Sequence, residues 1–171
     1  NDPFFGQGIR AEHKALRSKP LSVEILALPQ QGKPLDFKKI IGQFNIQASL
    51  GKKNLEVGGT TTLTIIVSGK GNIRGVTFPE PDLNGQFKVY PDQPEFKQTV
   101  AANQITGQKV FKFALVPLQS GTITLPAFTL DYFDPKGKNY RQIKTRPINL
   151  TVHPSSAEET LNHVQSNSTN N

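Results

Sequence analysis

The stretch KVFKFALVPLQSGTITLPAFTLDYFD, residues 109–134, decides the fold of this chain. It contains two runs in which large apolar residues alternate with polar or small ones, and a turn sequence at residues 118–121 separates them. The alternating apolar residues are Phe111, Phe113, Leu115, Phe128, Leu130 and Tyr132. A period of two is typical of β-strands that bury one face. We expect the two runs to pair with each other in the middle of a β-sandwich.

The same alternation recurs along much of the chain, most clearly at Phe44, Ile46, Ala48 and Leu50. Further strands are expected at residues 55–57, 60–68, 73–78, 87–90, 95–100, 104–116 and 140–152. The strand at residues 95–100 is polar and is expected at a sheet edge, and the strand at residues 140–152 is expected to have a bulge at Arg146 and Pro147. Short strands separated by Gly- and Pro-containing turns predict an all-β fold. We expect an immunoglobulin-like β-sandwich of about seven to nine antiparallel strands.

Composition limits the function classes. The chain has 171 residues, 35% of them hydrophobic, and no cysteine, so neither a disulfide nor a thiol nucleophile is available. The formal net charge is +7, but the lysines are scattered and no aromatic residues interleave with them. We interpret these lysines as residues of solvated strand faces and loops, and we expect no nucleic-acid partner. The alternative is an anionic partner.

An apolar run precedes the main domain. In KPLSVEILALP, residues 19–29, Leu21, Val23 and Ile25 alternate with other residues as in a strand. RPINLTVHP, residues 146–154, has the same order of cation, proline, alternating apolar residues and closing proline. This internal repeat indicates that the first run is the last strand of a preceding domain of the same type, and it makes these three residues a candidate interaction strand. The alternative is that the run is the first strand of this domain.

These patterns divide the chain into three parts. Residues 1–42 are expected to hold the C-terminal strand of the preceding domain and a linker, and residues 43–154 the sandwich. Residues 155–171 are rich in Ser, Asn and Thr. We expect this tail to be mostly disordered, because the short helix that residues 157–164 could form is marginal on its own.

The sequence shows no reactive constellation. His13, His153 and His163 lack the spacing of metal ligands, and Asp131 and Asp134 precede a Pro-x-Gly turn, where such residues are ordinary. No nucleophile or acid–base pair can be named. We therefore predict a protein that is not an enzyme, with no catalytic residues, no bound metal and no cofactor.

Aromatic residues near predicted loops offer a binding surface instead. Phe78, Phe87, Phe96 and Tyr140 all border loop sequences and could form one exposed aromatic patch. The alternative is that they pack in the core or against loops.

Several short motifs, taken in order, resemble one protein family. They are Asp2-Pro3-Phe4-Phe5-Gly6, Leu28-Pro29, Gly32-Lys33-Pro34, Phe37, Gly42-x-Phe44, Ala48-Ser49-Leu50, Val57-Gly58, Leu63-Thr64-Ile65, Gly69-x-Gly71-Asn72-Ile73, Val116-Pro117, Gly121, Leu125-Pro126 and Tyr132-Phe133-Asp134-Pro135. Together they are similar to the BatD family of bacterial aerotolerance proteins over residues 1 to 154. Gly59 and Thr60 depart from the acidic residue and proline that the family commonly has in that turn.

The resemblance implies a membrane-anchored periplasmic protein with tandem immunoglobulin-like domains, whose anchor is expected to lie outside these residues. Its implied partners are Bat proteins with von Willebrand factor A domains and, indirectly, a MoxR-type ATPase, in a complex linked to oxygen-stress tolerance. It supplies no catalytic residues. We expect a non-enzymatic protein-interaction module, with a carbohydrate- or cell-wall-binding sandwich as the alternative.

Overall fold

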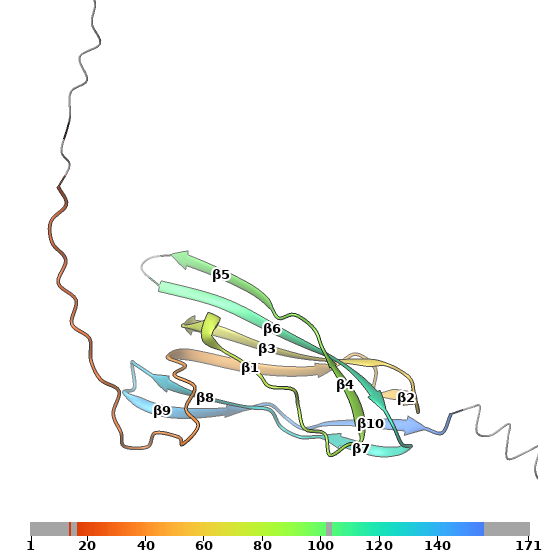
Figure 1. Ribbon diagram of the computed structural model, residues 1–171. Coiled ribbons are helices and arrows are strands. Elements are labelled where there is room, and N and C mark those ends of the chain that lie inside the picture. The colour runs from red at the N-terminus through yellow and green to blue at the C-terminus, as the bar shows by residue number, and fades with distance from the viewer. Residues whose placement is uncertain (1–13, 15–16, 102–103, 156–171) are drawn as a thin grey trace, which may run out of the picture.

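The computed structural model describes residue 14, residues 17–101 and residues 104–155. These residues form strands and a single turn of 3₁₀ helix, η1 (Figure 1). The elements are β1 (Gly42–Leu50), β2 (Asn54–Glu56), β3 (Thr61–Gly71), η1 (Ile73–Gly75), β4 (Phe87–Pro91), β5 (Glu95–Ala101), β6 (Gln104–Pro117), β7 (Gly121–Leu125), β8 (Thr129–Asp134), β9 (Asn139–Lys144) and β10 (Ile148–His153). The predicted all-β fold is confirmed.

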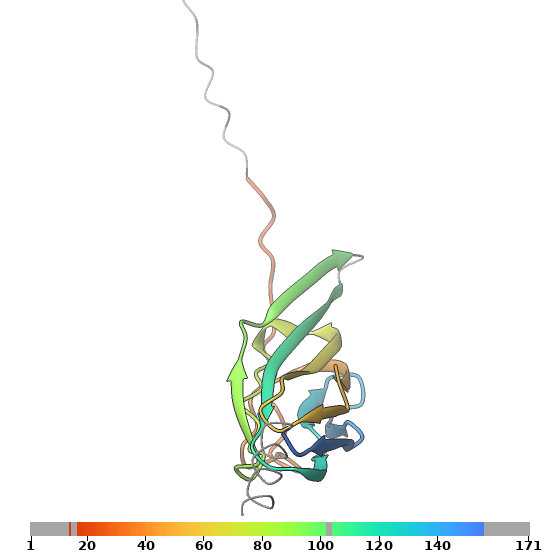
Figure 2. The same cartoon turned by 90° about the vertical axis from the view of Figure 1, so that its right-hand side faces the viewer.

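One layer of the sandwich is an antiparallel sheet in the order β1, β3, β6 and β4. β5 pairs with the same edge of β6 as β4 does, but with residues 104–110 rather than 113–117. β4 and β5 therefore form one interrupted edge strand. All residues of β5 are exposed, and the β5–β6 ribbon projects beyond the other strands (Figure 2). The predicted polar edge strand is confirmed.

The other layer is a long hairpin with a break in its middle. β7 pairs with β10 and β8 pairs with β9, all antiparallel, and β2 adds to β10 in parallel. Residues 126–128 face residues 145–147 across the break. Both arms of the hairpin contribute three residues there, so neither has the extra residue that defines a bulge. The predicted bulge at Arg146 and Pro147 is therefore wrong. Pro126 and Pro147 cannot donate to the ladder, and pairing stops on both sides at once.

The two runs of residues 109–134 do not pair with each other, contrary to the prediction. β6 lies in the first layer and pairs with β3, whereas β8 lies in the second and pairs with β9. The turn at residues 118–121 carries the chain from one sheet to the other. Alternation shows which face of a strand is buried, but it does not identify the strand's partner.

The core fills the space between the layers. Leu63 and Leu115 of the first layer are 0% exposed, and Leu125 and Leu150 of the second layer are almost as deeply buried. Phe44 of β1 and Tyr132 of β8 meet edge to face across the layers, with ring centroids 5.5 Å apart. The expected inward positions of β1, β3 and β6 are thus confirmed, because the alternating apolar residues of each strand form this core.

The order of the first sheet and the parallel addition of β2 to the last strand match an immunoglobulin-type sandwich. The second sheet of such a sandwich has one more strand, which would lie beside β8. Here an irregular segment takes its place, since Thr77, Phe78 and Pro79 lie against Thr129–Asp131 around a small pocket. The predicted strand at residues 73–78 is therefore wrong. Asn72 caps η1 through its side chain, which accepts a hydrogen bond from the Gly75 amide at 3.3 Å.

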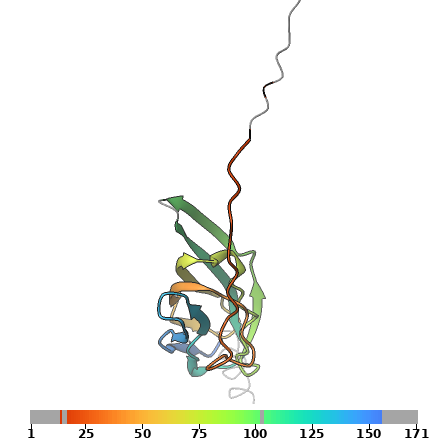
Figure 3. The ribbon, with the colours of Figure 1, turned by 90° about the vertical axis from the view of Figure 1, so that its left-hand side faces the viewer.

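Residues 17–27 extend away from the sandwich (Figure 3). Leu21, Val23 and Ile25 are 88%, 73% and 92% exposed, and residues 21–28 form no strand in the described structure. The alternative that this run is the first strand of the domain is therefore wrong. The predicted helix at residues 157–164 and most of the polar tail lie outside the described residues.

Candidate functional site

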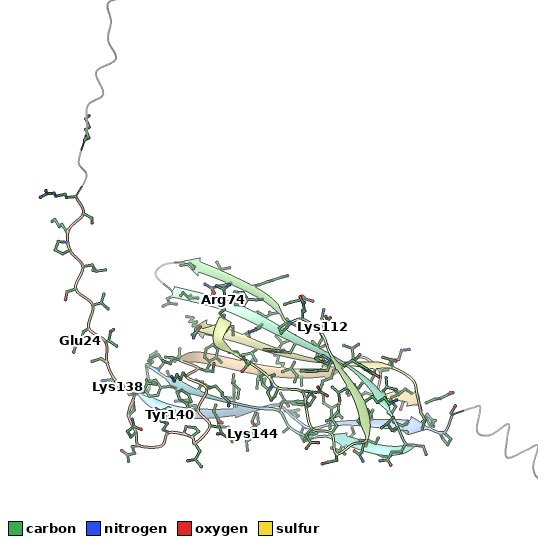
Figure 4. The ribbon with its side chains drawn as sticks, viewed as in Figure 1. Glu24, Arg74, Lys112, Lys138, Tyr140 and Lys144 are labelled. Carbon is green, nitrogen blue, oxygen red and sulfur yellow. The ribbon has the colours of Figure 1, made fainter. Side chains whose placement is uncertain are left out.

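The linker before β1 is fixed to the β8–β9 hairpin by aromatic contacts. The ring of Tyr140 packs edge to face on Phe37 at 4.9 Å and on Phe133 at 5.1 Å between centroids. Its hydroxyl donates a hydrogen bond of 2.8 Å to the carbonyl of Pro29 (Figure 4). Beyond these rings, the Phe133 amide donates to the carbonyl of Ile40 at 2.8 Å. The chain is therefore held from Pro29 onward, and segment 21–28 leaves the domain from a fixed point.

The four candidate aromatic residues do not form one exposed patch. Phe87 is 6% exposed and belongs to the core, so its predicted exposure is wrong. Phe78 is half-buried on Phe111, with ring centroids 5.3 Å apart, and Tyr140 is half-buried under the linker. Phe96 is 36% exposed and lies under the Arg74 guanidinium, 5.9 Å from the ring centroid. The alternative of core and loop packing accounts for Phe78, Phe87 and Tyr140.

Lysine side chains brace the β5–β6 ribbon. Lys109 donates to the carbonyls of Arg74 and Val76 at 3.0 and 2.7 Å, which ties β6 to η1. Burial, and secondly the charge of Arg74, lower the pKa of Lys109. On the same ribbon, Lys112 donates to Glu95, and this hydrogen bond together with the lysine charge lowers the pKa of Glu95 (Figure 4).

Asp134 organises the β8–β9 turn. Its carboxylate accepts hydrogen bonds from the Lys136 amide at 3.0 Å and the Gln43 side chain at 3.3 Å, and Arg141 lies 3.4 Å away. Burial raises the pKa of Asp134, but backbone donors at Gly137 and Lys136, then Gln43 and Arg141, together lower it below its ordinary value. Asp131 instead accepts from Gln142 at 2.9 Å. Both carboxylates are thus engaged by hairpin residues.

The histidines are not brought together by the described structure. His153 ends β10, where its carbonyl accepts a hydrogen bond of 2.9 Å from the Val57 amide, while His13 and His163 lie outside the described residues. Over residues 17–101 and 104–155, no three side chains of His, Cys, Asp or Glu are gathered as metal ligands would be.

A groove of about 780 Å³ runs along the outer side of β1. One side is formed by residues 45–49 of β1 with Thr64 and Ile66 of β3, and the other by residues 144–148 at the break between β9 and β10. Lys53, Lys144 and Arg146 are its charged residues. Sequence patterns did not identify this groove, because its two sides are about a hundred residues apart in the chain and only the packing of the layers brings them together.

The described residues form an all-β sandwich domain with an immunoglobulin-like strand order. The sequence model of the BatD family, described as "BatD DUF11 like domain", matches residues 48–152, which is more than half of the chain, and the chain therefore belongs to the BatD family. The comparisons with curated proteins and with solved structures find no match. Among the described residues, no helix is long and apolar enough to cross a bilayer.

Proposed function

We propose that this domain is a non-enzymatic protein-interaction module of a membrane-anchored periplasmic protein. Its partners are Bat proteins with von Willebrand factor A domains, and indirectly a MoxR-type ATPase, in a complex associated with oxygen-stress tolerance. Membership of the BatD family supports the assignment to the Bat system. The role in the complex, its location and its partners are part of the proposal.

The main support for the proposal is the exposure of the apolar segment 21–28. Leu21, Val23 and Ile25 are exposed, extended and alternating, and the segment starts from a point that Tyr140 fixes. An extended apolar segment with unpaired backbone groups gains free energy by joining a sheet edge. Strand addition of this kind is a common mode of peptide recognition, in which main-chain hydrogen bonds supply affinity and alternate side chains supply specificity.

The test is capture of the ectodomain of a Bat protein with a von Willebrand factor A domain. The chain is compared with a variant that carries Val23→Pro and Ile25→Pro. Prolines remove backbone donors and are excluded from paired strand interiors, so capture by the variant should be lost if the segment adds as a strand. Both residues are exposed in the described structure, so the sandwich should keep its stability. Equal capture by both chains would reject strand addition by this segment.

The carbohydrate-binding alternative loses its main support. In the sequence it rested on exposed aromatic residues together with Asp82, and Phe87 is in the core while Phe78 and Tyr140 are half-buried. A glycan array separates the two proposals, because the interaction module should give no specific glycan signal.

A further inference from the structure

The groove along β1 has an unpaired strand edge. The Gly51 amide donates to Thr62 and the Asn72 amide donates to Ile41, both at 3.0 Å, at the two ends of the β1–β3 ladder. The register between them is unbroken, so alternate residues bond to β3, and the N–H and C=O groups of Ile46 and Ala48 point the other way. Within residues 17–101 and 104–155, no second strand pairs with residues 45–49. The edge is open to a further strand.

The charge of the groove has one sign. Lys53, Lys144 and Arg146 line it, all three are exposed, and no carboxylate is among the lining residues. The ion pairs found in the described part of the chain are Lys112 with Glu95 and Arg141 with Asp134, so these three cations take part in neither. Exposed cations along an open strand edge, with no ion-pair partner among residues 17–101 and 104–155, complement a negatively charged extended chain.

The break in the long hairpin supplies the second wall. Residues 145–147 lie between β9 and β10, where Pro147 cannot donate and the Thr145 amide is already bonded to Phe128 at 2.9 Å. Arg146 therefore lies in an irregular segment and not in a paired strand. Half-buried Ile66 and exposed Pro147 add apolar surface beside the cations, and buried Ile148 lies beneath them.

We propose that this groove binds an acidic extended segment of a partner protein, which adds to the outer edge of β1. Residues 45–49 span roughly 15 Å of strand, enough for a partner segment of about five residues. Acidic side chains of that segment would meet Lys53, Lys144 and Arg146, and apolar side chains would meet the exposed surface of Pro147. The inference rests on the proposed function as an interaction module, but it does not depend on segment 21–28.

The test uses a blocked synthetic peptide in which Glu and Val alternate, titrated into the ¹⁵N-labelled chain. Amide shifts are expected at Ile46, Ala48, Lys144, Thr145, Arg146 and Ile148, whereas Pro147 has no amide proton to report. The peptide with Lys in place of Glu should not bind. Raising the salt concentration from about 0.05 M to about 0.5 M should weaken binding several-fold, because exposed charges are screened. A peptide N-methylated at alternate residues should lose binding if main-chain pairing is involved.

Charge reversal separates the groove from the general positive charge. Lys144→Glu with Arg146→Glu should weaken peptide binding about five- to tenfold. Lys88→Glu with Lys97→Glu, at exposed positions of β4 and β5 on the opposite edge of the sheet, lowers the net charge equally, so this matched control should bind more tightly than the groove variant. Equal weakening by both variants, or shifts spread over all lysines, would overturn the proposal. So would anionic phospholipid vesicles, a single-stranded oligonucleotide or a second copy of this chain occupying residues 45–49 in preference to the peptide.

Failure of the groove proposal can be distinguished from failure of the proposed function. If the Bat ectodomain is captured but neither it nor the acidic peptide shifts residues 45–49, the groove proposal fails and the interaction module stands. If the acidic peptide binds in the groove while no Bat ectodomain is captured, the groove proposal stands and the assignment of partners fails.

Discussion

The hydroxyl of Tyr140 on β9 donates a hydrogen bond of 2.8 Å to the carbonyl of Pro29, which lies 111 residues earlier in the chain. This contact marks the place where the chain joins the sandwich. On one side of it, segment 21–28 is exposed, and on the other, Phe37 and Ile40 pack against the β8–β9 hairpin. Tyr140 therefore sets the direction from which any preceding part of the protein reaches this domain.

Replacing Tyr140 tests this anchor. Tyr140→Phe keeps the ring contacts and removes the bond to Pro29, so we expect a loss of about 0.5 to 1.5 kcal/mol in the free energy of unfolding. Tyr140→Ala also removes the contacts with Phe37 and Phe133, and should cost more. Amide hydrogen exchange of residues 30–40 should quicken in both variants. Unchanged exchange in Tyr140→Ala would show that the linker is held by other contacts.

The carboxylate of Asp134 should make stability depend on acid pH. Its pKa is lowered in the folded domain, so the charged form contributes stability that is fully present above the unfolded pKa of about 3.9 and is lost as the pH falls through the folded value. Asp134→Asn should therefore lower the melting temperature near pH 7 and have less effect near pH 2. Asp36→Asn, on the exposed linker, is the control. A melting-temperature difference that is independent of pH would contradict this role.

The core should be sensitive to truncation. Leu63 is 0% exposed at the centre of β3, so Leu63→Ala should lower the free energy of unfolding by about 2 to 5 kcal/mol in urea titration. Val100→Ala on the ribbon, where Val100 is 67% exposed, should change it by less than about 0.5 kcal/mol. Similar losses for the two variants would mean that the sandwich core is not where the structure places it.

Gly107 should tolerate no side chain. A Cβ there would lie 2.6 Å from the Lys97 carbonyl oxygen and 2.9 Å from Ile73, so Gly107→Ala should force β5 or η1 to shift, at a cost of about 1 to 3 kcal/mol. Gly51→Ala is the matched control, because its Cβ would meet neighbours at 3.7 Å and beyond. Urea titration compares the two. Equal stability of both variants would contradict the packing of the β5–β6 ribbon on η1.

The strands that sequence alternation predicted best are those with one buried face. Phe44 and Ile46 in β1, and Phe111 and Phe113 in β6, all point into the core. The strand predicted at residues 73–78 failed for a local reason, since the Asn72 side chain and Gly75 favour a capped turn. The alternation also could not predict which strands pair, because β6 and β8 alternate in the same way but lie in different layers.

The candidate sites were harder to predict than the fold. Phe87 borders a loop in the sequence, yet it starts β4 and its side chain is buried. The groove depends on residues 45–49 and 144–148 coming together, and nothing local in either segment signals that contact. Lys53, Lys144 and Arg146 look like scattered surface charges until the layers place them around one strand edge.

The proposed interaction is tested most directly by a titration of the ¹⁵N-labelled chain with the ectodomain of a Bat protein that has a von Willebrand factor A domain. We predict saturable shifts confined to segment 21–28 and to the groove, including Ile46, Ala48 and Lys144. The absence of saturable shifts with any Bat ectodomain, or shifts confined to the far edge at β4 and β5, would contradict the proposed interaction.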